Sequence, residues 1–94
     1  MFMTILEAKV EPEKWEDLKS KFREMAQRIP PQMLHTYLAQ SVSDPTVWKG
    51  VSLWRSREAL MEYRKEVQTP EGIALFKSMG AEPAVSMYDV AEFA

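Results

Sequence analysis

The most constraining feature of the chain is the junction between Leu53 and Leu60, where an apolar segment ending in Trp54 runs almost directly into a helix start. Ser56 is a favoured N-cap residue, and Glu58 in the first turn complements the positive end of the helix dipole. A strand followed so closely by a capped helix predicts a layer of helices packed on a sheet.

Similar signals divide the rest of the chain, and the element order reads β-α-β-β-α-(α)-β. The predicted strands are 2–10, 33–42, 46–54 and 85–93, and the predicted helices are 12–29, 56–67 and 70–80. Pro12 suits a first helical position, and the pair Pro30-Pro31 ends that helix. Thr69-Pro70 predicts another helix start, and Gly80 predicts its left-handed end. Together these signals predict one α+β domain over residues 1–94, with a four-stranded antiparallel sheet.

Both faces of the predicted sheet are apolar, whereas a sheet with water on one side alternates apolar and polar residues. In the first strand, for example, Phe2 and Leu6 oppose Met3 and Ile5. If about eight side chains on the helix-free face gain about 1.5–3 kcal/mol each on burial, the total is on the order of 10 kcal/mol after discounting. That value is comparable with a whole domain's stability. We therefore expect a homodimer whose sheets pack face to face into a barrel-like core.

The composition of the 94 residues narrows the possible functions. A net charge of −2 gives no basic surface for phosphates, which disfavours nucleic-acid binding. The chain has no cysteine, so disulfides, thiolate nucleophiles and cysteine-based metal sites are excluded. The apolar N-terminal segment is interrupted by Glu7 and Lys9, so no membrane span is expected there, and a cytoplasmic location is the default.

The run Trp54-Arg55-Ser56-Arg57-Glu58-Ala59-Leu60, with Thr69-Pro70 and Phe76 downstream, resembles the antibiotic biosynthesis monooxygenase family. This family is part of the dimeric α+β barrel superfamily, and the resemblance spans nearly the whole chain. It implies a ferredoxin-like fold and a pocket between the sheet and the helices. Active members resembled here oxidise quinols or aromatic polyketides with dioxygen and without metal or flavin, and relatives degrade haem.

The chain also departs from the family pattern. It contains no asparagine, although the active monooxygenases and the haem-degrading relatives use one in their pockets. Many relatives carry a histidine near Tyr63 or Arg64, and another near Glu71, and neither is present here. A haem ligand would have to come from His35, the only histidine, so haem degradation is disfavoured and no cofactor or metal is expected.

Six residues are candidates for the site. We predict His35 as general base, because it titrates near neutral pH, with Trp54 as a stacking wall and Tyr63 as a hydrogen-bond donor. The predicted substrate-binding residues are Tyr37, Phe76 and Tyr88. Each has a structural alternative: His35 could lie at the dimer seam, Trp54 could be a wedge between strand and helix, and a buried tyrosine could simply bond to backbone.

Two functional hypotheses follow from these residues and this resemblance. The first is a cofactor-independent monooxygenase-like enzyme that acts on an aromatic, quinol or polyketide-type small molecule. The second is a non-catalytic dimeric module of the same fold that binds an apolar ligand. Oxygen uptake with hydroquinones, compared with ligand binding alone, distinguishes the two.

Overall fold

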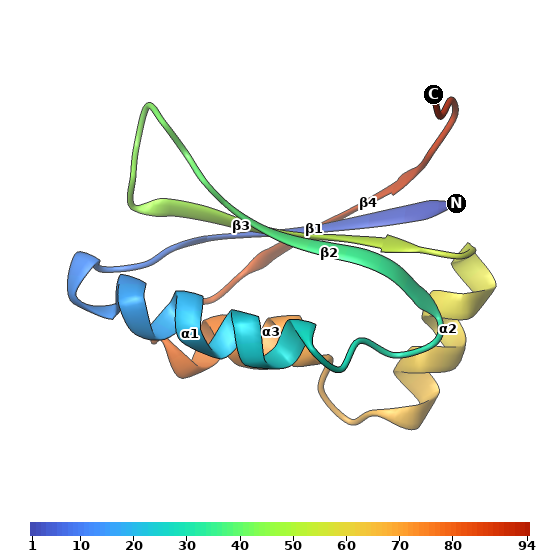
Figure 1. Cartoon of the computed structure of the whole chain (residues 1–94), viewed down its shortest axis with the longest axis horizontal. Coiled ribbons are helices and arrows are strands. Elements are labelled where there is room, and N and C mark those ends of the chain that lie inside the picture. The colour runs from blue at the N-terminus through green and yellow to red at the C-terminus, as the bar shows by residue number, and fades with distance from the viewer.

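The computed structural model describes residues 1–94 as one four-stranded antiparallel sheet with all of its helices on one side (Figure 1). The strands are β1 (Phe2–Lys9), β2 (Met33–Gln40), β3 (Val47–Trp54) and β4 (Ala84–Asp89), and the sheet order is β2-β3-β1-β4. The helices are α1 (Trp15–Ala26), α2 (Arg57–Glu66) and α3 (Glu71–Ser78), with a short 3-10 turn η1 (Pro12–Lys14) before α1. The predicted α+β, ferredoxin-like fold is confirmed.

The strand register decides which side chains face the helices. Directly paired residues of an antiparallel sheet point to the same face. Thr4 pairs with Ser52 and faces the helices, whereas its neighbour Ile5 pairs with Val51 and faces away. Phe2, Thr4 and Ala8 are accordingly buried.

Two apolar clusters fill the space between the sheet and the helices. The larger cluster contains Leu18, Trp48, Leu75 and Phe76, where Trp48 also meets Trp15 edge to face at 5.9 Å between ring centres. The smaller cluster joins the ends of β1 and β3 to α2, and consists of Phe2, Trp54, Leu60 and Tyr63. The candidate site lies where these clusters meet.

Two glycines allow α3 to lie close to the sheet. A Cβ atom on Gly50 would stand 3.3 Å from Cε2 of Phe76, and one on Gly72 would stand 2.9 Å from Cδ1 of Leu6. Phe76 is 1% exposed, so it has little freedom to move away. The missing side chains thus keep the distance between helix and sheet short.

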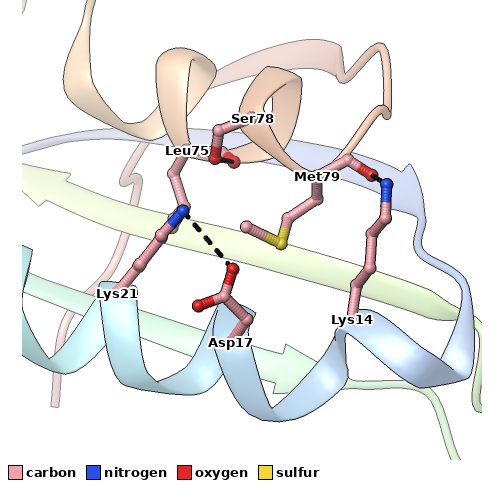
Figure 2. A network of polar contacts seen from close by, with 6 residues as sticks. All are labelled: Lys14, Asp17, Lys21, Leu75, Ser78 and Met79. Atoms are coloured by element: carbon pink, nitrogen blue, oxygen red, sulfur yellow. Dashed lines mark hydrogen bonds and ion pairs between the residues drawn. The ribbon is translucent and has the colours of Figure 1, made fainter.

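One hydrogen bond joins the turn η1, just before α1, to the end of α3, as Figure 2 shows. The Lys14 ammonium donates to the Met79 carbonyl at 3.3 Å, which satisfies a carbonyl at the C-terminal end of α3. Gly80 follows with φ of 75°, the left-handed conformation expected for this glycine. Beside this contact, Asp17 and Lys21 form a pair one turn apart on α1, with 3.3 Å between carboxylate and ammonium.

Several predicted boundaries were wrong. The first helix was predicted to include Pro12 and Ile29, but it begins with a 3-10 turn and ends at Ala26. The last strand ends at Asp89, and Phe93 beyond it is 72% exposed. Thr69 does not cap α3, whose N-cap position is Pro70 without a side-chain hydrogen bond. Both ends of an element fray, so short-range signals leave its boundaries uncertain by a few residues.

A β-bulge in β2 changes the predicted faces of that strand. Met33 pairs with Trp54 and His35 pairs with Leu53, so Leu34 is an extra residue in the ladder. Met33 was expected on the same face as Tyr37, but the bulge turns it toward the helices. It lies in the wall of the cavity described below.

The helix-free face of the sheet is apolar over one half and charged over the other. Its apolar half contains Met3, Ile5, Val51, Leu53, Tyr37 and Tyr88. Both tyrosines are about half exposed in the single chain, at 54% and 50%. The charged half includes an ion pair between Glu7 and Lys49 at 3.5 Å. No helix of the chain is long and apolar enough to cross a membrane.

Candidate functional site

A cavity of about 60 Å³ lies between the sheet and the helices. Residues from β1, β2 and β3 form its floor, and α1, α2 and α3 supply the other walls. Most of the lining is apolar, including Leu6, Met25, Met33 and Phe76. The exposed side chains of Arg64 and Glu71 lie at its edge, where α2 gives way to α3. An apolar pocket with few polar groups is typical of a small-molecule site.

Trp54 and Tyr63 form one wall of this cavity. Leu60 and Tyr63 are three residues apart on α2 and therefore share the face that packs against the end of β3. The Trp54 and Tyr63 ring centres are 5.1 Å apart with an interplanar angle of 42°. Both side chains are buried, at 4% and 6% exposure, so their positions are determined by packing on several sides.

The Tyr63 hydroxyl is held by the beginning of α3. Its oxygen accepts a hydrogen bond from the Glu71 backbone N–H at 3.1 Å. Burial raises the pKa of Tyr63 above its ordinary value of 10.0, although the Glu71 N–H acts in the opposite direction. The hydroxyl therefore keeps its hydrogen at neutral pH, and that hydrogen is free to be donated to a ligand.

The floor of the cavity carries three hydroxyl groups that the sequence analysis missed. They belong to Thr4, Ser52 and Thr36, which line the cavity from β1, β3 and β2. The Trp54 indole N–H donates to the Thr4 oxygen at 3.0 Å, and the Ser52 and Thr36 oxygens are 3.2 Å apart. Polar residues inside otherwise apolar strands were the available signal.

The six predicted site residues divide between the two faces of the sheet. Trp54, Tyr63 and Phe76 line the cavity, so the structure brings these three together. The other three, His35, Tyr37 and Tyr88, lie on the helix-free face.

The expectation that His35 would share a cavity with Trp54 and Tyr63 was wrong in its geometry. His35 pairs with Leu53, one residue before Trp54, and successive side chains of a strand point to opposite faces. Its ring instead stacks on Tyr37, with 6.2 Å between ring centres. The titratable residues that do line the cavity are Tyr63, Arg64 and Glu71.

The fold and the cavity define a ferredoxin-like α+β domain with a small-molecule pocket beneath its sheet. The sequence profile described as antibiotic biosynthesis monooxygenase matches residues 1–71. The chain therefore belongs to this family. No curated protein matched the chain.

Solved structures share the fold over almost their whole length. A candidate antibiotic biosynthesis monooxygenase of Deinococcus radiodurans is 15% identical with a TM-score of 0.78, and the match covers 100% of this chain and 96% of that one. A second candidate monooxygenase, from Caulobacter crescentus, is 23% identical with a TM-score of 0.72, covering 97% and 91%. The haem-degrading protein MhuD of Mycobacterium tuberculosis, solved with two haems in its active site, is 18% identical with a TM-score of 0.75, covering 100% and 99%.

The cavity of this chain does not fit a haem. Its volume of about 60 Å³ is far too small for a porphyrin, and no histidine lines it. Tyrosinate is another haem ligand in proteins, but burial raises the pKa of Tyr63 and so disfavours that form.

Proposed function

We propose that the chain is a small oxygenase that oxidises a single-ring, electron-rich aromatic compound such as a hydroquinone, with dioxygen as the oxidant. The observation that carries this proposal is the apolar cavity whose wall joins the Trp54 ring to the free hydroxyl hydrogen of Tyr63. Family membership supports the reaction class.

The size of the cavity favours a single ring over a polycyclic substrate. An engineered protein cavity that binds benzene measures about 150 Å³, whereas this one measures about 60 Å³. A ring must therefore displace part of the wall when it enters. Met25 and Met33 are suited to this, because unbranched thioether side chains change rotamer easily.

The proposed reaction balances without an outside reductant. A hydroquinone and one dioxygen give a hydroxyquinone and one water: one oxygen atom forms a new carbon–oxygen bond, and the ring supplies all four electrons. In this mechanism Tyr63 donates a hydrogen bond to a substrate oxygen and the surrounding residues exclude water. Glu71 takes the role of proton acceptor in place of His35, because it is the carboxylate beside the cavity.

A second candidate function is ligand binding without turnover. It is favoured by the exposure of Glu71, which leaves the buried part of the cavity without a group that titrates near neutral pH. Under this alternative the same compounds bind and no oxygen is consumed.

An oxygen electrode with a panel of substituted hydroquinones tests the proposal. We expect enzyme-dependent oxygen uptake, and we expect Tyr63→Phe to lower kcat/KM by roughly tenfold, since one hydrogen bond to a reacting oxygen contributes about 1–1.5 kcal/mol. Ser86→Ala removes a hydroxyl from the opposite face of β4 and serves as the control with unchanged kcat/KM.

Two results would contradict the enzyme proposal. One is the absence of protein-dependent uptake together with ligand-induced thermal stabilisation, which would support the binding module instead. The other is uptake that Tyr63→Phe leaves unchanged, which would remove the assigned donor.

We also propose that two chains associate through the helix-free face of the sheet. Its apolar half joins Met3, Ile5, Val51 and Leu53 with the two half-exposed tyrosines, and a continuous apolar patch of this kind marks an interaction surface. A second copy of the same face supplies a matching apolar surface, as a two-fold interface requires.

A further inference from the structure

We infer that Thr4, Ser52 and Thr36 form a binding subsite for an acceptor oxygen of the ligand, such as a carbonyl or phenolate oxygen. This inference rests on the proposed function, because it assumes that the cavity beneath the sheet is the ligand site. It adds a specificity determinant on the cavity floor, where neither the family match nor the sequence analysis places one.

The three hydroxyl groups lie in one row across the sheet. Thr4 pairs with Ser52 between β1 and β3, and Ser52 pairs with Thr36 between β3 and β2. Paired residues share a face, so all three side chains point toward the helices, and all three line the cavity. The row is a polar strip on a floor whose other members, such as Leu6 and Leu38, are apolar.

Each end of the row has a hydrogen to donate. Thr4 is buried, at 7% exposure, and its hydroxyl accepts from the Trp54 N–H, but none of the chain's hydrogen bonds uses the hydroxyl's own hydrogen. Ser52 and Thr36 share one hydrogen bond, which occupies only one of their two hydroxyl hydrogens. Two hydroxyl hydrogens are therefore available on the floor.

The two available hydroxyl hydrogens determine which kind of ligand atom binds at this position. A buried hydroxyl that finds no acceptor is unfavourable, so an acceptor oxygen entering the cavity gains affinity at this position. No charged side chain lies on the floor; Arg64 and Glu71 are exposed at the edge. The subsite therefore suits the carbonyl or phenolate oxygen of a small ring compound and provides no countercharge for an ammonium group.

The hydrogen bond from Trp54 connects this subsite to the aromatic wall. The indole N–H is committed to Thr4, which holds the Trp54 ring in one orientation next to Tyr63. A flat ring against Trp54 would place an oxygen within reach of the neighbouring Thr4 hydroxyl. Thr4 thus positions the ring wall and contacts the ligand.

Two ligands that differ by one oxygen test the subsite. Acetophenone carries a carbonyl where ethylbenzene carries a methylene group, and the two have nearly the same shape. We expect Thr4→Val to weaken acetophenone binding about three- to tenfold, measured by calorimetric or NMR titration, and to leave ethylbenzene binding within about twofold. Thr4→Ser keeps the hydroxyl and should retain most of the acetophenone affinity. Ser86→Ala, on the opposite face of the sheet, should change neither affinity.

The outcomes separate this inference from the proposed function. The subsite is refuted if Thr4→Val weakens the binding of both ligands equally. It is also refuted if Thr4→Ser weakens acetophenone binding as much as Thr4→Val does. In both cases the ligands still bind, so the cavity remains the ligand site. If neither ligand binds the wild-type chain, the cavity is not the ligand site and both proposals are overturned. Thermal unfolding of each variant checks that the variant is folded, so that weaker binding is not the result of unfolding.

Discussion

At the residue scale, a side chain's role depends on which face of the sheet it occupies. Tyr63 is fixed by its packing against Trp54 and by the Glu71 N–H, so its hydroxyl oxygen is held in place at the cavity wall. Histidine is the side chain that most often serves as a general base, but His35 lies on the other face. The location of a side chain therefore decides its role in this site more than its intrinsic reactivity does.

The variant His35→Ala tests whether His35 is the general base, as the sequence predicted, or takes no part in the reaction, as its place in the structure indicates. Because the His35 side chain lies on the opposite face of the sheet from the cavity, we expect His35→Ala to keep kcat/KM for hydroquinone oxidation within about twofold. Steady-state oxygen uptake measures this, with light scattering to confirm that the assembly is unchanged. A loss of 100-fold or more in an intact assembly would instead support the general-base role.

The sequence could predict Trp54, Tyr63 and Phe76 as cavity residues, because the strand end, the helical spacing and the family pattern all place them on the inner side. It could not predict the hydroxyl row. Whether Thr4, Ser52 and Thr36 come together depends on the register of three strands, and no local pattern determines that register.

At the scale of the elements, caps and breakers act locally, and for this reason they could be predicted. Ser56 accepts a hydrogen bond from the Ala59 N–H at 3.0 Å, as its place after the strand indicated. The β-bulge at Leu34 could not be predicted in the same way, since it arises from how β2 fits against β3 rather than from β2 alone.

Removing the cap of α2 should lower the stability of the whole domain. We expect Ser56→Ala to reduce the free energy of unfolding by about 1 kcal/mol, because the Ala59 N–H loses its acceptor. Urea unfolding followed by circular dichroism measures the change. Ser56→Asp should stay close to wild type, and Ser20→Ala on the exposed side of α1 is the matched control. Equal stability of Ser56→Ala and wild type would show that the cap contributes nothing.

At the scale of the whole molecule, the apolar half of the helix-free face is the surface through which two chains are proposed to associate. The sequence predicted a helix-free face that is apolar throughout; the structure has this over the half that contains Met3 and Ile5, while Glu7 and Lys49 make the other half charged. In the single chain Val51 and Leu53 are half-buried at the centre of this face, so a second copy packed on it would complete their burial.

A charge at the centre of this face should separate the two chains. We expect the wild-type chain to be a dimer and Val51→Lys to weaken association at least about 100-fold, because an unpaired buried charge costs about 3–5 kcal/mol. Analytical ultracentrifugation over a concentration series measures this. Val42→Lys, at a position that is 98% exposed between β2 and β3, should remain dimeric. A wild-type monomer at micromolar concentration would refute the dimer.

The glycines under α3 have a consequence for how this scaffold can change. Gly50 and Gly72 both line the cavity, so a side chain added at either position would take up part of its space. At Gly50 the added Cβ would press on the buried Phe76 ring, whereas at Gly72 it would meet the end of the Leu6 side chain, which can rotate away. A single methyl group at either glycine therefore narrows the range of ligands that fit while every hydrogen-bonding group keeps its place.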